Sequence, residues 1–499
     1  MKLLNRYILL FAAAGTLCSC HDWLDITPED TTTEDKLFSD FSGYHSAING
    51  LYQTLASEQL YGENLTWGFV SALSQYYNNK TAEDASRKKF CYTEQYMYNT
   101  DEVKDFAEDI WQTGYNVIAN CNNIVQHLDK ADPAMFPNRE MGEMDMIRGE
   151  ALAIRGMMHF DLLRLFADAP VVNKTQKAIP YSTSYPNKFP TRYTTEEVLE
   201  KVITDMEEAS ALLVKCDSVG RPCYGYLDTT TDRYLISNSG YGFFFTARGV
   251  RLNYIAVRSL LARVYAYAGD LESAYDCAKE IDDIFVKQLE CYRYNPFTKV
   301  DSQSSRPHKM LDDLIACFYS GTLVTDYSNS GAMRQIDKNP YAIKNLDNIF
   351  NDTDDYRLTK LIIDLDQTTK SSLKYHERAG NSAGVDVENC LLPIMRLSEL
   401  RMLMAEYLTK NNQITDAVQI VNSQRIARGC QIRTIPENIS SEDLLEEINM
   451  EMWRENVAEG QYFFFCKRIN APTINNSGTH IQMEGKYTLP IPDSETSLN

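Results

Sequence analysis

The stretch from Ala262 to Ala278 reads ARVYAYAGDLESAYDCA, and it decides the fold class. Small and aromatic residues recur at helical spacing, Gly269-Asp270 interrupts the run, and a second run follows with Ala274-Tyr275. Small residues let two antiparallel helices approach closely, while aromatic side chains fill the groove between them. The stretch therefore predicts a hairpin of two helices within residues 252–286.

The same arrangement recurs further along the chain. Residues 400–421 carry Ala405 and Ala417, twelve residues apart, on either side of a polar turn. Ala262 and Ala274 have the same spacing. Two matched copies favour a repeat of the tetratricopeptide kind over a single accidental amphipathic hairpin.

Two further hairpins are predicted nearer the N-terminus. Helical periodicity pairs residues 41–56 with 106–128, and residues 145–166 with 195–213. The sequence holds 23 Gly and 16 Pro among 499 residues, below the usual ~7% and ~5%, which favours helices over a turn-rich β-sandwich. We therefore expect a mainly α protein: a tetratricopeptide-like scaffold of about four hairpins with long loop insertions, forming a single domain over residues 41–499.

The N-terminus has the pattern of an export signal. Lys2 and Arg6 accompany the short apolar run 7–14, which is too short to span a bilayer as a permanent helix. No later window holds about 18 consecutive apolar residues. We therefore expect the body of the protein to lie outside the bilayer.

A lipid anchor is predicted directly after this signal. Leu17-Cys18-Ser19-Cys20 resembles a bacterial lipobox, with a small residue before Cys20. Cys18 is a poorer candidate because a bulky Leu precedes it, and an ordinary cleaved signal is the alternative. We expect residues 1–19 to be a lipoprotein signal peptide, Cys20 to be acylated, and residues 20–40 to form a lipidated tether and wrapping arm.

The charge balance argues against nucleic-acid binding. Asp and Glu number 69 against 49 Lys and Arg, which gives a net charge of −20. The densest basic cluster, Arg87-Lys88-Lys89, is three residues long and is flanked by acidic residues. Because a phosphate backbone is repelled by such a surface, no nucleic-acid partner is expected.

Motifs along nearly the whole chain resemble those of the SusD/RagB family of outer-membrane nutrient-binding lipoproteins. They are Asp22–Pro28, Ala47–Tyr52, Glu150–Leu162 with Phe166–Pro170, Glu451–Arg468 and Leu489–Pro492. The resemblance implies a cell-surface protein, anchored in the outer membrane, that binds an oligosaccharide or, in some members, a peptide. It further implies a lid that closes over a SusC-like TonB-dependent transporter. Ligand specificity is not transferable, because members of the family differ most in their loops.

Candidate ligand-binding residues come from two irregular insertions. Sugar recognition needs flat aromatic faces and planar polar side chains, and of the 4 Trp residues only Trp67 falls in a long loop between helices. We hypothesise that both insertions line one concave edge; the alternative is that the same residues pack the loops onto the scaffold. The candidates are Trp67, Tyr76, Tyr77, Asn78, Tyr319, Tyr327, Asn329 and Arg334.

Signatures of catalysis are weak. Residues 380–384 match G-x-S-x-G, but the segment before them is polar, whereas a nucleophile elbow needs a buried strand. No H-E-x-x-H, P-loop or G-x-G-x-x-G pattern occurs in the sequence. We therefore expect a binding protein that is not an enzyme and needs no cofactor or metal. The alternative function is that of a helical-repeat adaptor lipoprotein for a peptide or protein.

Overall fold

The computed structural model describes residues 34–496 apart from 78, 80–84, 188–190, 236–240, 298–305, 334–338, 344–345, 368, 381, 431–433 and 476. The predicted signal peptide, the lipidated Cys20 and most of the predicted arm lie outside the described residues. Among the helices of the described part, none combines the length and the apolar character needed to cross a bilayer.

Long helices form the body of the molecule and confirm the predicted fold class. α3 pairs with α6, α7 with α8, α10 with α11, and α16 with α17, and these are the four predicted hairpins. The long helices are α3 (Phe41–Leu55), α6 (Asp101–Leu128), α7 (Glu143–Phe166), α8 (Thr195–Asp217), α10 (Tyr254–Ala268), α11 (Leu271–Ile281), α16 (Leu397–Lys410), α17 (Ile414–Ala427), α18 (Ser441–Glu455) and α19 (Gln461–Ile469).

The stretch that decides the fold class forms its hairpin through two caps and one glycine. Asn253 caps α10 by accepting a hydrogen bond from the amide of Ala256 at 3.0 Å. Gly269 ends α10 with φ 91°, a conformation that glycine adopts without a steric penalty. Asp270 then caps α11 by accepting a hydrogen bond from the amide of Ser273 at 3.0 Å. The turn therefore follows directly from its sequence.

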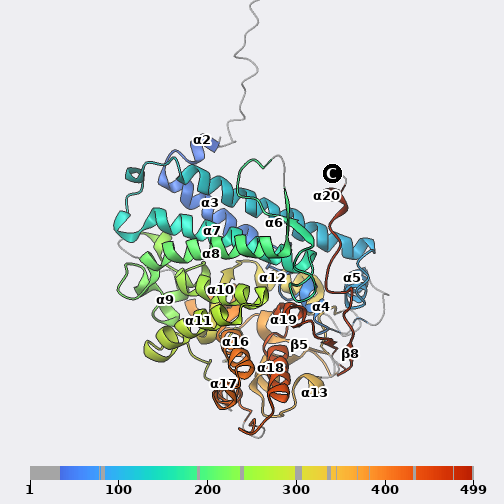
Figure 1. Cartoon of the computed structure of the whole chain (residues 1–499). Helices are drawn as coiled ribbons and strands as arrows, with labels where there is room; N and C mark the ends of the chain where they lie inside the picture. The colour runs from blue at the N-terminus through green and yellow to red at the C-terminus, as the bar shows by residue number, and fades with distance from the viewer. Residues whose placement is uncertain are drawn as a thin grey trace, which may run out of the picture.

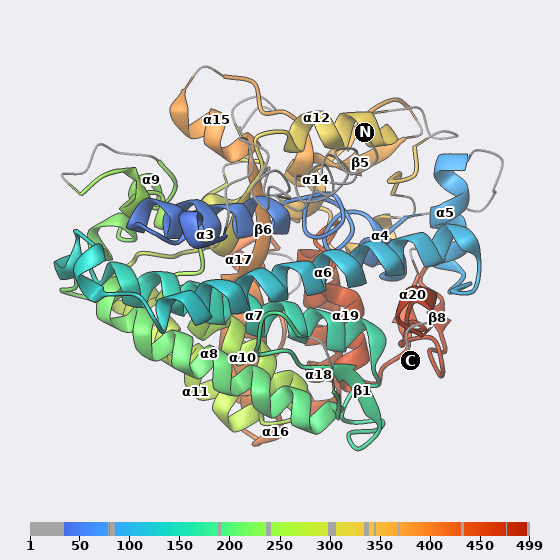
Figure 2. The same ribbon diagram turned by 90° about the horizontal axis from the view of Figure 1, so that it is seen from above.

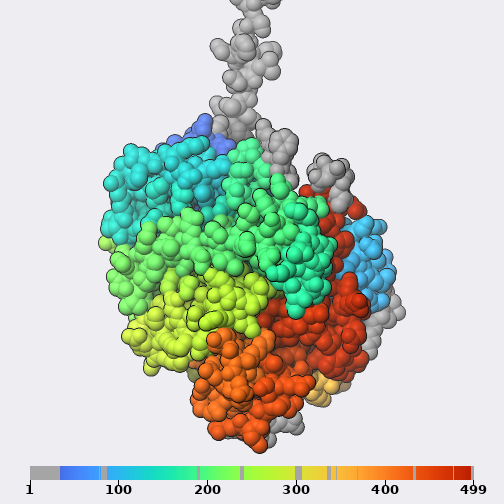
Figure 3. All heavy atoms as spheres, viewed as in Figure 1, coloured from blue at the N-terminus to red at the C-terminus, as the bar shows by residue number. Residues whose placement is uncertain are grey.

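Successive hairpins stack into one continuous body. Figure 1 shows the helices in layers from α3 and α6 through α7, α8, α10 and α11 to α16 and α17, and Figure 3 shows the same order as bands of colour. Tyr275 of α11 stacks on Tyr407 of α16, with ring centroids 4.4 Å apart. Arg263 of α10 donates to both carboxylate oxygens of Glu399 of α16, at 2.6 and 2.7 Å. Aromatic contacts and buried ion pairs thus join neighbouring hairpins.

The insertions contain short strands and helices. Four antiparallel two-stranded sheets pair β1 (Lys177–Pro180) with β2 (Arg192–Thr194), β3 (Leu314–Tyr319) with β6 (Leu391–Arg396), β4 (Ile362–Asp364) with β5 (Lys370–Ser372), and β7 (Thr473–Ile474) with β8 (His480–Ile481). The short α-helices are α2 (Glu34–Leu37), α4 (Phe69–Leu73), α5 (Ala85–Glu94), α9 (Thr230–Tyr234), α12 (Leu323–Tyr327), α13 (Leu346–Ile349), α14 (Tyr356–Leu361), α15 (Ala383–Asn389) and α20 (Asp493–Thr496). Single-turn and π-helical segments complete them: η2 (Pro133–Met135), η3 (Arg139–Met141), η4 (Tyr224–Tyr226), η5 (Phe243–Phe245), η6 (Arg248–Val250), η7 (Asp282–Gln288), η8 (Leu311–Asp313), η9 (Ser328–Ala332) and η10 (Leu373–Tyr375).

A buried ion-pair network attaches α14, in the second insertion, and the end of α17 to α18. Arg357 of α14 donates to Glu451 at 2.7 Å and to Glu455 at 2.9 Å. Arg425 donates to Glu451 at 2.6 Å, and Arg428 donates to Glu455 at 2.7 Å. Both carboxylates are buried on α18. Because each buried charge has partners of opposite sign, the network holds the insertion in one position at a tolerable desolvation cost.

Candidate functional site

Four of the eight predicted ligand-binding residues lie in the core. Trp67 has no exposed surface, and Tyr76, Tyr77 and Tyr327 are buried. The Trp67 indole meets the Tyr327 ring edge to face, with centroids 5.0 Å apart, and meets the Tyr341 ring at 5.1 Å. The two insertions contact each other, but these four side chains join them by packing and have no free face for a ligand.

The other predicted residues fall into two groups. Tyr319 and Asn329 are exposed at the surface. Asn78 and Arg334 lie outside the described residues. Of the predicted aromatic residues, only Tyr319 presents its ring to solvent, with 48% of its surface exposed.

Tyr319 borders an open groove of about 610 Å³ beside α3, which we call the aromatic groove. Figure 2 shows α3 along the edge of the helical layers, with α9 on the side away from α6. Phe243 is its most exposed aromatic residue, with 68% of its surface accessible. The groove is lined by His45, Asn49, Tyr52, Gln53, Phe243, Phe244, Thr246, Ala247, Val250, Arg251 and Tyr319.

Phe244 forms a fixed aromatic surface in this groove. The His45 ring stacks on it with centroids 3.5 Å apart and an angle of 2° between the planes. The Arg251 guanidinium lies 4.2 Å from the same ring centroid, and Arg251 donates to the carbonyl oxygen of Phe244 at 2.7 Å. Stacking, a cation–π contact and a hydrogen bond together hold this residue in one orientation.

Buried charges from the scaffold position these groups. Glu150 of α7 accepts hydrogen bonds from Arg251 at 2.9 Å and from the Tyr52 hydroxyl at 2.8 Å. Its second carboxylate oxygen accepts from Arg248, which also donates to both oxygens of Asp217. Burial alone would raise the pKa of Glu150, but Arg251 and Arg248 outweigh it and lower that pKa. The buried ion pairs beneath the groove, which we call its floor, therefore fix the positions of Tyr52 and Arg251 in the lining.

Strand β3 sets the position of Tyr319. Alternate side chains of a strand point to opposite faces, and Phe318 is buried whereas its neighbour Tyr319 is exposed. Phe318 packs against Tyr52 of α3 at 5.9 Å between ring centroids. The same strand thus anchors itself to α3 and presents an aromatic ring at the rim of the groove.

The groove combines the two kinds of group that sugar recognition requires. Phe243 and Tyr319 offer exposed ring faces, while Asn49 and Gln53 offer exposed amide groups one helical turn apart on α3. Arg251 is committed to Glu150 and Phe244. Within the described residues, no group of three or more His, Cys, Asp or Glu side chains is arranged to hold a metal ion.

The sequence offered one signal for this groove that the list of candidates left out. The run Phe243-Phe244-Phe245 stands in a region of loops and short elements. Phe245 of this run is buried and Phe243 is exposed, so the run divides between the core and the surface. Asn49 and Gln53 gave no such signal, because polar residues on an amphipathic helix face solvent in any case.

Comparison with known proteins gives consistent matches. A model of the SusD-like family described as "Starch-binding associating with outer membrane" matches residues 22–219. The SusD-like protein P38 of Formosa agariphila is 22% identical, over 94% of this chain and 92% of its own. A SusD-like carbohydrate binding protein of Bacteroides vulgatus has a similar structure, with a TM-score of 0.66, 18% identity and coverage of 92% and 96% of the two chains. A SusD superfamily protein of Bacteroides thetaiotaomicron has a TM-score of 0.63, 21% identity and coverage of 92% and 98%.

The fold and the groove define a class: helical-hairpin proteins in which loop insertions build a surface site on a rigid scaffold. The chain is similar to SusD-like proteins over nearly its whole length, and it shares the fold of the SusD superfamily structures. These similarities agree with the resemblance that the sequence motifs indicated.

Proposed function

We propose that this protein captures an oligosaccharide in the aromatic groove and does not cleave it. One observation carries the proposal: Phe243 and Tyr319 expose large ring surfaces above a floor that buried ion pairs hold rigid. A preorganised aromatic surface binds the apolar faces of sugar rings without an ordering cost. The carbohydrate-binding relative in Bacteroides vulgatus supports the same ligand class.

We further propose that the protein works as the lid of a SusC-like TonB-dependent transporter, anchored in the outer membrane through acylated Cys20. The family description, which associates its members with the outer membrane, supports this location. A lipid tether would hold the captured ligand near the transporter at high effective concentration. Modest affinity in the groove would therefore be sufficient.

The groove is tested by binding measurements on the full chain, purified in detergent. Isothermal calorimetry against starch, xylan, mannan and galactan, and against peptide digests, identifies the ligand class. The double variant Phe243→Ala/Tyr319→Ala should weaken oligosaccharide binding about 5- to 150-fold, since each aromatic contact contributes about 0.5–1.5 kcal/mol. Met97→Ala removes an exposed apolar side chain that does not line the groove, and it should leave binding unchanged.

The possible outcomes separate the proposals. Binding of peptides without any polysaccharide would favour the helical-repeat adaptor. Polysaccharide binding that survives the double variant would exclude the groove as the site. Chromatography of the bound oligosaccharide after prolonged incubation should recover it at its original length, and shortened products would show catalysis.

The anchor and the partner are tested separately. Cys20→Ala should abolish incorporation of a labelled fatty acid and release the protein from outer-membrane fractions. Affinity purification of the lipidated chain from its native membrane should also recover a TonB-dependent transporter. Absence of that transporter from the purified material would contradict the lid proposal without affecting the groove.

A further inference from the structure

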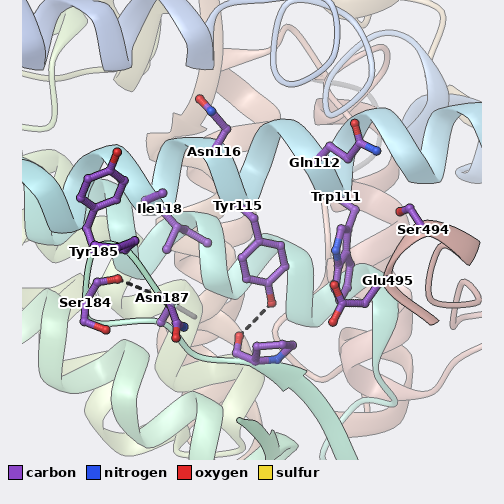
Figure 4. Close-up of a pocket in the computed structure, with 14 residues that line it drawn as sticks. Trp111, Gln112, Tyr115, Asn116, Ile118, Ser184, Tyr185, Asn187, Ser494 and Glu495 are labelled. Carbon is purple, nitrogen blue, oxygen red and sulfur yellow. Dashed lines mark hydrogen bonds between the residues drawn. The ribbon is translucent and has the colours of Figure 1, made fainter. Parts of the chain in front are cut away.

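A second cleft, of about 520 Å³, runs along α6, between this helix, the loop after β1 and the C-terminal α20. Figure 4 shows Tyr185 at one end of it and Glu495 at the other, with Tyr115 between them. The Tyr115 hydroxyl donates to the carbonyl oxygen of Pro180 at 2.8 Å. Gln126 bonds to the backbone carbonyl and amide of Tyr185 at 2.8 and 2.9 Å. These contacts hold the loop beside about 16 Å of the helix, so the cleft is elongated.

The part of α6 beside this cleft is free of charged side chains. Residues 111–126 include no Asp, Glu, Lys or Arg, although such residues make up 24% of the chain. Glu495 is the single charged residue among the described residues that line the cleft, and Arg192 pairs with it at 3.9 Å. One stripe of the helix, at intervals of three and four residues, consists of Gln112, Asn116, Ala119, Asn123 and Gln126. Covered protein surfaces are depleted of charged residues, so this stripe has the composition of a surface that another segment covers.

The part of the predicted arm before α2, residues 21–33, joins the described chain at one end of the cleft. These residues lie outside the described part, which begins at Glu34. Oε1 of Glu34 lies 3.3 Å from Nε2 of His127, and the Phe38 ring stacks on the His127 ring with centroids 4.2 Å apart. His127 directly follows Gln126, the residue that holds Tyr185. The arm therefore starts beside the Tyr185 end of the cleft.

The arm is long enough to follow the cleft from end to end. From Gln126 to Gln112 the axis of α6 measures about 21 Å. An extended chain from residue 33 back to Leu24 spans up to about 30 Å. The residues matched by the SusD-like family model begin at 22, so the match includes most of the arm together with the first helices of the body.

The arm also has a suitable sequence for an uncharged cleft. Its large apolar residues are Trp23, Leu24 and Ile26, and Asp25 stands between the last two. In an extended chain alternate side chains point to opposite sides, so Leu24 and Ile26 share one side while Asp25 points to the other. The exposed Asn116 amide offers a donor and an acceptor, which the main chain of an extended segment needs as partners.

We infer that residues 22–28 of this chain dock in the cleft, extended along α6 from Tyr185 towards Glu495, with Leu24 and Ile26 facing the helix. Docking covers the uncharged stripe and leaves residues 21–23 between Leu24 and Cys20. Where Cys20 is acylated, which rests on the anchor proposed above, the Glu495 end of the body would be held close to the bilayer. The docking itself depends neither on acylation nor on the aromatic groove.

Photo-crosslinking in the full chain, purified in detergent, tests the docking. p-Benzoylphenylalanine replaces Leu24, and mass spectrometry of the digest should locate a cross-link within the same chain to residues 111–119 or 180–187. The same probe at Asp25 should give at most about a third of that yield, because this position faces away from the helix. Asn116→Trp fills the cleft and should lower the yield from position 24 at least about threefold. Gln419→Trp, on the exposed surface of α17, should leave it unchanged.

Hydrogen exchange gives an independent readout without a probe. Leu24→Asp/Ile26→Asp places two charges against the uncharged stripe, so the amides of residues 183–187 should exchange at least about threefold faster than in the unmodified chain. Thr31→Asp/Thr32→Asp adds the same charge outside the docked residues and should leave their exchange unchanged.

The contrary outcomes are specific to the docking. Absence of a cross-link from position 24, a cross-link to another part of the chain, or equal exchange in the two double variants would each overturn the inference. A cross-link between two chains would do so as well, because it would assign the cleft to a second copy. None of these outcomes bears on ligand capture in the aromatic groove, which calorimetry measures separately.

Discussion

Two regions of this molecule are rich in aromatic residues and differ in exposure. The aromatic cluster of Trp67, Tyr77, Tyr327, Tyr341 and Tyr375 is buried, whereas the aromatic groove exposes Phe243 and Tyr319. In the cluster, rings cover one another, with Trp67 within 6.0 Å of three tyrosine rings between centroids. In the groove, His45 and Arg251 cover Phe244 while its neighbour Phe243 stays open. Ring surface left uncovered by protein is what distinguishes a binding surface from a core.

The tyrosine hydroxyls of the cluster are hydrogen-bonded as well as buried. In the cluster, Tyr341 donates to Glu63 at 2.9 Å and Tyr375 donates to the carbonyl oxygen of Ala458 at 2.9 Å. Buried tyrosines need such partners, because an unpaired buried hydroxyl is costly. The cluster therefore contributes to stability through both its rings and its polar atoms, and substitutions in the two regions should affect different properties.

The largest expected effect is on stability, from Trp67→Ala. Removal of a fully buried indole leaves a cavity between the two insertions, and large-to-small core changes of this kind cost about 3–5 kcal/mol. Denaturant unfolding of the full chain should show this loss, and Trp67→Phe should lose less because it keeps part of the ring. A loss within about 0.5 kcal/mol for Trp67→Ala would mean that the cluster does not join the insertions as described.

Acid should weaken the support beneath the cluster. Lys374, the neighbour of Tyr375 in the chain, donates to the carbonyl oxygen of Glu455 at 2.9 Å, so the cluster is linked to the end of α18. Burial would raise the pKa of Glu455, but Arg428 and Arg357 outweigh it and hold that pKa at about 2, below its ordinary value of 4.5. The resulting stabilisation is complete above pH 4.5 and is lost as the pH falls from 4.5 towards 2.

The expected loss over this pH range is about 3 kcal/mol in the free energy of unfolding. Glu455→Gln should destabilise the protein already at neutral pH, because it leaves buried guanidinium groups unpaired, and it should flatten the acid dependence. Glu196→Gln is the control, since Glu196 pairs with Lys174 at the exposed surface and such pairs contribute little. Equal acid dependence in both variants would contradict the role of Glu455.

Phe243→Ala should lower ligand affinity in the groove while leaving the free energy of unfolding almost unchanged. The ring is mostly exposed, so its loss should change the free energy of unfolding by no more than about 0.5 kcal/mol. Oligosaccharide affinity should fall about two- to twelvefold, as measured by calorimetry. A variant that loses stability and affinity together would place Phe243 with the cluster rather than with the groove.

The sequence predicts features that depend on neighbouring residues better than features that depend on distant contacts. The spacing of Ala262 and Ala274 predicted a hairpin whose turn is local, because Gly269 and Asp270 carry the information for it. Which face of an aromatic ring in a loop remains exposed is not determined by the residues next to it in the sequence. Trp67 is buried by Tyr327 and Tyr341, which lie about 260 residues or more away in the chain, and no periodic pattern reports such a contact.

Tyr319 differs from these buried candidates in its exposure. It is the last residue of strand β3, and about half of its surface stays exposed in the described part of the chain. The run Phe243-Phe244-Phe245 is visible in the sequence. Which of its rings is covered depends on other elements, because His45 and Arg251 cover Phe244 and Glu150 holds Arg251 in place. Composition can therefore suggest an aromatic site, whereas tertiary contacts decide which rings belong to it.

The smallest expected effect is on ligand affinity, and it distinguishes the contribution of the Tyr319 ring from that of its hydroxyl. If the ring stacks on a sugar face, Tyr319→Phe keeps the flat surface and should change affinity by less than about threefold, while Tyr319→Leu keeps apolar bulk without a planar ring and should lose more. Neither change should alter the unfolding free energy, since this side chain is half exposed. Calorimetry on both variants measures the difference. A larger loss for Phe than for Leu would assign the contact to the hydroxyl, and the groove would then recognise its ligand by hydrogen bonding at this position instead of by stacking.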